Sequence, residues 1–419
     1  MNIKKESTGG GLRSLVGTRA FYKKVLLVAV PIMIQNGITN FVSLLDNIMV
    51  GQVGTEQMSG VAIANQLVFI FNLCIFGAVA GAGILGAQFY GSGNSEGVRD
   101  TFRFKLLFGV ILSAIFAVIF LTVGEPLIQQ FIHQGEGIGD LEATRSYGKA
   151  YLEVIVIGIL PFALTQCYSG TLRETGETVI PMIAGIIAVL VNLVFNYILI
   201  FGKLGAPELG CVGAAIATVL SRFVELAIVA GWTHKHVARN PFIRGALRSF
   251  KIPGGLLKQI IAIGLPLFIN ELMWSFGITF MTQCYSVRGL EVVAAFNIAN
   301  TISNVFNVVF LSLGNSVGII IGQMLGAGRL EEAKREDKQL IAFSVFCCFL
   351  TGGMLILVLP FFPRMCNTEE IVKELATQLI FITGCCQPLY GFVHGTYFTL
   401  RAGGKSVVTF LFDSAYMWA

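Results

Sequence analysis

The stretch that decides the fold reads GTEQMSGVAIANQLVFIFNLCIFGAVAGAGILGAQFYGSG at residues 54–93, and it recurs as GLEVVAAFNIANTISNVFNVVFLSLGNSVGIIIGQMLGAG at residues 289–328. The two copies align without a gap, and they share polar residues and glycines as well as apolar ones. Among the aligned pairs are Gln88 with Gln323 and Gly91 with Gly326, and upstream Pro31 aligns with Pro266 at the same offset. A repeat of this length indicates a protein built from two equivalent halves.

Both copies are almost free of charge. No Asp, Glu, Lys or Arg occurs between Glu56 and Glu96, or between Glu291 and Arg329, whereas a helix needs only ~20 residues to cross the hydrocarbon core of a bilayer. The whole chain of 419 residues is 55% hydrophobic and 13% charged, with a mean hydropathy of +0.76. Soluble domains carry about 25% charged residues. The composition therefore excludes a large soluble protein and indicates a polytopic membrane protein.

Apolar runs predict ten spans and the start of an eleventh, an all-α membrane fold. The first half holds six spans, so symmetry predicts twelve helices in two six-helix lobes related by a pseudo-twofold axis along the membrane normal, with the last one and a half helices expected beyond Ala419. The predicted spans cover residues 25–50, 57–91, 106–124, 151–172, 179–201, 212–232, 259–287, 292–325, 339–363 and 375–400, with the eleventh starting near 406.

Charge patterning predicts the division of the chain and its orientation. We expect a tail at 1–20, a first lobe at 21–233, a basic linker at 234–256 and a second lobe at 257–419. Lys and Arg concentrate in the tail, in the linker and in the loops after even-numbered spans, which places these in the cytoplasm of a cell-membrane protein. The net charge of +5 thus reflects orientation in the lipid bilayer, its main partner, and no nucleic acid is expected. We expect a monomer.

Signatures of catalysis are missing from the sequence. It contains no HExxH, no GxSxG and no complete phosphate-binding loop, and the cysteines and histidines form no metal-binding pattern. We therefore expect no enzyme activity and no cofactor, and any pumping would be driven by an ion gradient.

Charged residues inside spans are the candidate site residues, because each costs on the order of 3 kcal/mol in a bilayer. Asp46, Glu271 and Asp413 are such acids, and Asn192 and Asn196 lie one helical turn apart on one face of the fifth span. One carboxylate with two carboxamides offers oxygen ligands for Na⁺, with Asp46 as the metal ligand, or a network that shares a proton. The alternative is that Asp46 is an interfacial residue near the end of a helix.

In combination, several motifs resemble the multidrug and toxic compound extrusion (MATE) family over essentially the whole chain. They are DNIMVG at 46–51, GAQFYGSGN at 86–94, GTLR at 170–173 with Gly176, the segments 192–197 and 213–218, GLP at 264–266, and 322–328. The resemblance implies a twelve-helix transporter that exports cationic amphipathic compounds in exchange for Na⁺ or H⁺, these being the coupling ions.

The resemblance also implies roles for individual residues. Asp46 resembles the family's first-helix cation-binding aspartate, with Asn192, Asn196 and Thr218 as its partners. Glu271 resembles the acid of the seventh helix, and we assign it to the substrate site with Asp413 and Asn300. For Asn300 and its repeat partner Asn65, hydrogen bonds between packed helices are the favoured alternative. The tenth span lacks the acid that some members carry, which favours coupling through the first lobe.

A lipid-linked precursor flippase of the same superfamily is the alternative function. Such a protein needs a strongly cationic central cavity for pyrophosphate. Arg222 is the one basic residue expected to be well buried, against the acids Asp46 and Glu271, and this balance favours a cationic cargo.

Overall fold

The computed structural model describes residues 15–131, 140–361, 363 and 369–418. Most of the expected cytoplasmic tail, residues 1–14, lies outside this described part. Within it the chain forms helices and turns and contains no strand, which confirms the predicted all-α fold class.

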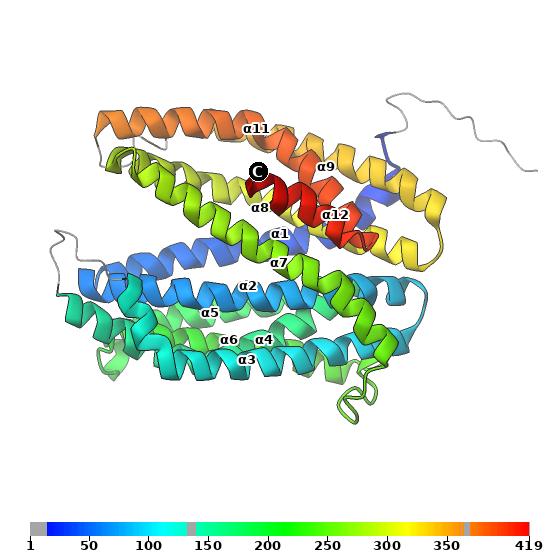
Figure 1. Ribbon diagram of the computed structural model, residues 1–419, viewed down its shortest axis with the longest axis horizontal. Helices are drawn as coiled ribbons and strands as arrows, with labels where there is room; N and C mark the ends of the chain where they lie inside the picture. Colours follow the sequence, from blue (N-terminus) through cyan, green and yellow to red (C-terminus); the bar gives the residue numbers. More distant parts are fainter. Residues whose placement is uncertain (1–14, 132–139, 362, 364–368, 419) are drawn as a thin grey trace, which may run out of the picture.

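The helices form two sets (Figure 1). The first lobe comprises α1 (Arg19–Gly51), α2 (Thr55–Gly91), α3 (Ser95–Phe131), α4 (Leu141–Glu174), α5 (Val179–Ile200) and α6 (Gly210–Lys235). The second lobe comprises α7 (Gly254–Ser286), α8 (Leu290–Gly326), α9 (Leu330–Val358), α11 (Glu370–Ala402), α12 (Ser406–Phe410), a π-helical turn (Leu411–Ala415) and α13 (Tyr416–Trp418).

Nine of the described helices are long and apolar enough to cross a membrane, by length and composition. α11 has 33 residues, as α1 and α7 do, but it is not among the nine. Several helices extend past the predicted spans: α3 begins at Ser95, where a start near residue 106 was predicted. Its polar first turns continue the helix because charges three residues apart pair on its surface, as Arg103 does with Asp100 at 3.0 Å.

Among the described helices, the two lobes contact each other toward one end (Figure 1). There the first half of α1 packs its buried Val25 and Ile32 against Leu313 and Ile320 in the second half of α8. Gly81 of α2 faces Gly264 of α7 so closely that a Cβ on Gly81 would clash with the Gly264 backbone. All these contacts lie toward the end where α2 and α8 finish. Toward the other end, where α1 finishes and α8 begins, the two sets of helices splay apart.

The repeated stretch itself makes a reciprocal contact between the lobes. A Cβ on Gly91 would clash with the backbone carbonyl of Gln323, and a Cβ on Gly326 would clash with that of Gln88. The side chains follow the same symmetry: Gln88 Nε2 donates to the carbonyl of the last α11 residue at 2.8 Å, and Gln323 Nε2 donates to that of the last α4 residue at 2.7 Å. Each copy of the repeat therefore caps a helix of the opposite lobe.

The close backbone crossing predicts that any side chain at these glycines lowers the stability of the protein. Gly91→Ala and Gly326→Ala should each lower the free energy of unfolding by about 1–3 kcal/mol, because the added methyl meets a backbone carbonyl that cannot rotate away. Thermal unfolding in detergent measures this. Gly353→Ala in α9 is the matched control, since nothing lies within 4 Å of its added Cβ and alanine favours a helix. Equal stability of Gly91→Ala and this control would contradict the crossing.

Candidate functional site

Four polar side chains meet inside the first lobe. Asp46 lies near the end of α1, Asn192 and Asn196 lie one turn apart on the inner face of α5, and Thr218 lies on α6. Asn196 Nδ2 donates to Asp46 Oδ1 at 2.6 Å and lies 3.2 Å from Asn192 Oδ1, while Asn192 Nδ2 lies 3.3 Å from Thr218 Oγ1. The structure thus brings together all four residues assigned to the cation site from the sequence.

The orientation of the Asn192 carboxamide decides how this set is connected. With its nitrogen toward Asp46, it donates to Oδ1 at 2.9 Å and to Oδ2 at 3.2 Å. With its oxygen in that place, the Asn192 Oδ1 faces the Asp46 carboxylate, and both groups are hydrogen-bond acceptors. A cation or a shared proton between them would stabilise this arrangement. Asn196 Oδ1 is buried and has no hydrogen-bond partner. Carboxylate, carboxamide and hydroxyl oxygens of this kind suit a hard cation such as Na⁺.

A second polar network lies in the second lobe, around the buried Asn270 of α7. Its Nδ2 donates to Asp413 Oδ2 at 2.8 Å and to the Tyr397 hydroxyl at 3.1 Å, and Ser414 Oγ donates to its Oδ1 at 2.7 Å. Asp413 and Ser414 both belong to the π-helical turn at Leu411–Ala415. Such widened turns occur frequently at functional sites, and here the turn brings two consecutive side chains to the same carboxamide.

Glu271 joins this network through an arginine. Arg401 Nη1 lies 3.4 Å from Glu271 Oε1 and donates to the Tyr397 hydroxyl at 3.0 Å. The second lobe therefore holds two acids in one network, although α11 itself supplies none. Asn300 is exposed on α8, and in the described part of the chain no hydrogen bond links it to this network. Its repeat partner Asn65 accepts a bond from the Tyr151 hydroxyl at 3.2 Å, a contact between packed helices.

Sequence reasoning missed a buried ion pair. Lys105 was expected in a polar loop, but it is fully buried in α3, with Nζ 2.6 Å from both carboxylate oxygens of Glu174. Gly83 and Gly86 of α2 make room for that carboxylate, since a Cβ at either would clash with it. The glycine pair, facing the end of α4, is the sequence signal that could have indicated a bulky polar group here.

The expectation that Arg222 is the one well-buried basic residue is wrong. Lys105 has no exposed side-chain surface and Arg401 is 4% exposed. Arg222 itself is partly buried and lies over the ring of Phe162, 5.1 Å from its centroid. Lys105 and Arg401 were both assigned to loops because they flank apolar runs. In the structure α3 and α11 extend past those runs, and both side chains are buried between helices.

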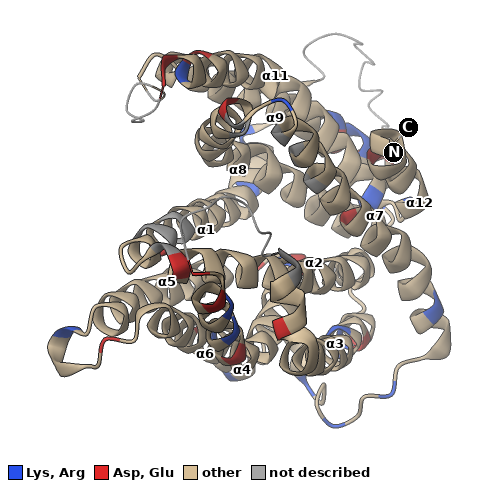
Figure 2. Ribbon diagram, turned by 60° about the vertical axis from the view of Figure 1, so that its left-hand side comes forward, with Lys and Arg blue, Asp and Glu red and all other residues tan. Residues whose placement is uncertain are grey.

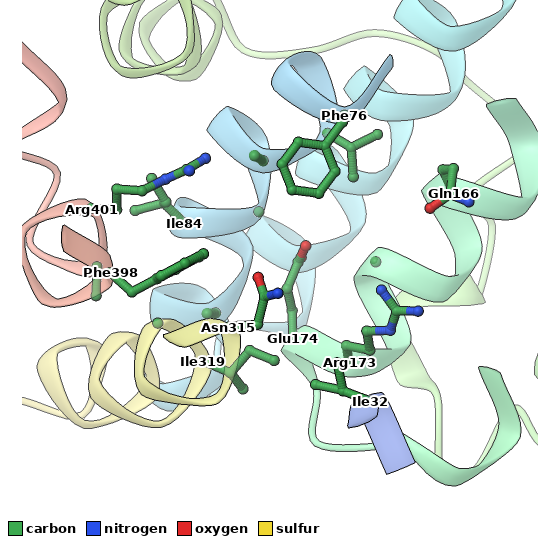
Figure 3. A pocket seen from close by; sticks show the side chains of 17 residues that line it. Ile32, Phe76, Ile84, Gln166, Arg173, Glu174, Asn315, Ile319, Phe398 and Arg401 are labelled. Atoms are coloured by element: carbon green, nitrogen blue, oxygen red, sulfur yellow. The ribbon is translucent and has the colours of Figure 1, made fainter. Parts of the chain in front are cut away.

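A cavity of about 140 Å³ lies between the lobes. α4 contributes Arg173 and Glu174 from one side, and α11 contributes Phe398 and Arg401 from the other (Figure 3). Phe76 of α2 and Asn315 of α8 are also in its wall. Asp46 and its three neighbours are not part of this wall, so the candidate cation site and the cavity are separate places in the molecule.

The buried pair predicts that the effect of replacing Lys105 on stability depends on whether Glu174 is still present. Lys105→Met alone should destabilise the protein by about 3–5 kcal/mol, because it leaves the Glu174 carboxylate buried without a partner. The double variant Lys105→Met/Glu174→Leu should recover most of that loss, since it removes both charges. Thermal unfolding of the purified protein measures both, and a double variant less stable than the single one would contradict the interpretation.

Comparison with known proteins adds a family and a fold. Residues 31–198 and 266–413 match the sequence model of the MatE family, so both matched segments begin at the repeat-related prolines. A probable multidrug resistance protein NorM of Thermotoga maritima is 26% identical over 399 residues, which cover 94% of this chain and 83% of that protein. The multidrug resistance protein MdtK of Edwardsiella ictaluri is 25% identical over 370 residues, covering 87% and 78%.

Among solved structures, the Vibrio cholerae MATE transporter VcmN in the bent form is similar, with a TM-score of 0.84 and 19% sequence identity over 97% of this chain and 88% of that one. At this identity the likeness concerns the fold, and it agrees with the two-lobed arrangement of helices.

Proposed function

Because this chain belongs to the MatE family of multidrug efflux transporters, a family of multi-pass membrane proteins, we propose that it acts as a monomeric antiporter in the cell membrane. It exports cationic amphipathic compounds in exchange for Na⁺ or H⁺. The observation that carries the proposal is the oxygen cluster of Asp46, Asn192, Asn196 and Thr218, in which both asparagines are buried. It lies outside the wall of the inter-lobe cavity, so ion and cargo can bind at different places.

The position of Asp46 on α1 supports coupling between ion binding and lobe movement. The Asp46 carboxylate is half-buried beside a neutral carboxamide. Such a charge within a membrane-spanning helix is costly, and binding Na⁺ or H⁺ lowers that cost. The other half of α1 packs against α8 of the second lobe, where Asn36 Nδ2 donates to Ser312 Oγ at 3.2 Å. Pro31 lies in the first half of the helix and removes a backbone hydrogen bond. Occupation of the Asp46 site can therefore alter how α1 meets the second lobe.

Alternating access follows from this linkage. The state described here has the lobes joined where α2 crosses α8, and a second state would separate that crossing and join the lobes at the opposite end. An ion and a cargo that bind these two states with different affinity exchange across the membrane, because each shifts the same equilibrium.

Orientation is part of the proposal. The segment between α6 and α7 carries exposed basic residues (Figure 2), among them Arg244, Arg248 and Lys251. By the positive-inside rule this segment and the N-terminal tail lie in the cytoplasm. The joined end of the lobes then faces the cytoplasm and the splayed end faces outward.

The flippase alternative is less well supported by the cavity. Arg173 and Arg401 both line it, but Glu271 neutralises Arg401 and Lys105 and Glu174 neutralise each other, which leaves the single charge of Arg173. A pyrophosphate-binding cavity would hold a larger excess of positive charge.

The Asp46→Asn variant tests the coupling site. In proteoliposomes it should lose gradient-driven efflux of a cationic dye, falling to the level of empty vesicles, while inserting normally. Na⁺ and H⁺ gradients are imposed separately, and the one that drives efflux in the wild type identifies the coupling ion.

Asp140→Asn is the matched control for this experiment. Asp140 is exposed and caps α4 by accepting from the backbone amides of Glu142 and Ala143 at 2.9 and 3.2 Å, and asparagine caps a helix equally well. Full efflux in Asp46→Asn would refute the assignment. A wild type that moves a lipid-linked pyrophosphate but no cationic dye would instead establish the flippase alternative.

A further inference from the structure

We propose that the inter-lobe cavity contains an oxyanion subsite, in which the guanidinium group of Arg173 binds a carboxylate of the transported molecule. The inference rests on the proposed export function and refines its substrate class. The preferred cargo is an amphipathic zwitterion, with a carboxylate beside the positive group, rather than a simple organic cation.

Arg173 lies at the edge of the cavity and has hydrogen-bond donors without a partner among the described residues. A guanidinium group has five N–H donors. Arg173 Nη2 donates to Gln35 Oε1 at 2.5 Å, and its Nε is buried without a partner. Within the described ranges no carboxylate lies within ion-pair distance of it. The adjacent Glu174 is held by Lys105, and Glu225 of α6 acts on Arg173 only from beyond that distance.

The repeat shows what Arg173 lacks. Its counterpart is Arg401, because Thr171-Leu172-Arg173 aligns with Thr399-Leu400-Arg401. Arg401 has an acid on the first helix of its own lobe, Glu271, 3.4 Å away. On α1 the positions that match residues 270 and 271 are the neutral amides Gln35 and Asn36. The first lobe therefore places an amide where the second places a carboxylate, and among the described residues its arginine has no acid within ion-pair distance.

A structural role at the helix end does not account for this difference. Both arginines lie in the last turn of their helices, where a positive charge interacts favourably with the helix dipole. That reason applies equally to the two, yet one is neutralised by an acid and the other is not. A ligand-binding arginine must keep its charge available, and its fork of donors matches a carboxylate in shape.

The size and walls of the cavity fit the end of a substrate. A cavity of about 140 Å³ holds a group of roughly the size of benzene, less than the ~300–1,000 Å³ of sites that enclose a whole ligand. Phe76 and Phe398 supply aromatic wall, with Phe398 on the side of the cavity opposite Arg173 (Figure 3). The subsite therefore suits an aromatic carboxylate whose remaining body lies outside the cavity.

A matched pair of dyes tests the subsite. Rhodamine B carries a carboxylate on a phenyl ring, and its ethyl ester carries the same cationic body without that charge. Gradient-driven efflux of each dye is measured in proteoliposomes, and the readout is the ratio of kcat/KM for the acid to that for the ester. Arg173→Gln should lower this ratio at least ~10-fold, the effect of losing one hydrogen-bonded ion contact. Arg173→Lys should lower it less.

Gln35→Glu provides a second variant that leaves Arg173 in place. It gives Arg173 an acidic partner, as Glu271 is for Arg401, at an atom position already bonded to the guanidinium group, and it should lower the ratio as Arg173→Gln does. Arg244→Gln removes an exposed linker charge and should leave the ratio unchanged.

The outcomes separate the two proposals. An unchanged ratio in both Arg173→Gln and Gln35→Glu, with the two dyes affected equally, would overturn the oxyanion subsite and leave the antiporter proposal standing. A wild type that exports the ester but not the acid would overturn the subsite as well. A wild type that moves neither dye under an Na⁺ or an H⁺ gradient would overturn the proposed function itself.

Discussion

The crossing of α2 and α8 is the contact on which the rest of the arrangement depends. At Gly91 and Gly326 the two backbones approach too closely for any side chain, and Gln88 and Gln323 cap the ends of helices in the opposite lobe. Within a bilayer the helices gain little from burying apolar surface against each other, so close backbone packing and hydrogen bonds hold them together. Both are concentrated at one end, and they join the lobes there.

The charged side chains inside the two lobes differ in whether a partner of opposite charge neutralises them. Lys105 with Glu174, and Arg401 with Glu271, are ion pairs that neutralise themselves within a lobe. Asp46 and Arg173 differ, because their side-chain partners are neutral amides. They carry opposite charge and lie in different places, one in the oxygen cluster and one at the cavity. An exchange of a small cation for a larger zwitterion would use both.

α1 connects these places. Asp46 near its end meets α5 and α6, Gln35 in its middle holds Arg173, and its first half packs on α8 of the other lobe. A change in the charge or ligation of Asp46 would therefore act on a helix that also contacts the cavity arginine and the lobe interface. In the proposed antiporter this shared helix would be the physical route for linkage, if both sites bias its position.

The sequence by itself determined the all-helical membrane fold, its duplication and its family resemblance, because long apolar stretches and a gapless repeat leave few alternatives. It also singled out Asp46, Asn192 and Asn196, since an acid inside a span is rare and a four-residue spacing puts two amides on one helix face. Only the tertiary structure decided which charges are neutralised. Lys105 and Glu174 lie 69 residues apart in the chain, and packing of α3 against α4 brings them together. Asp413 reaches Asn270 from the π-helical turn that follows α12, and Glu271 joins the same network through Arg401 of α11. Hydropathy records that such residues are polar, but the partner that each one meets depends on how the helices pack.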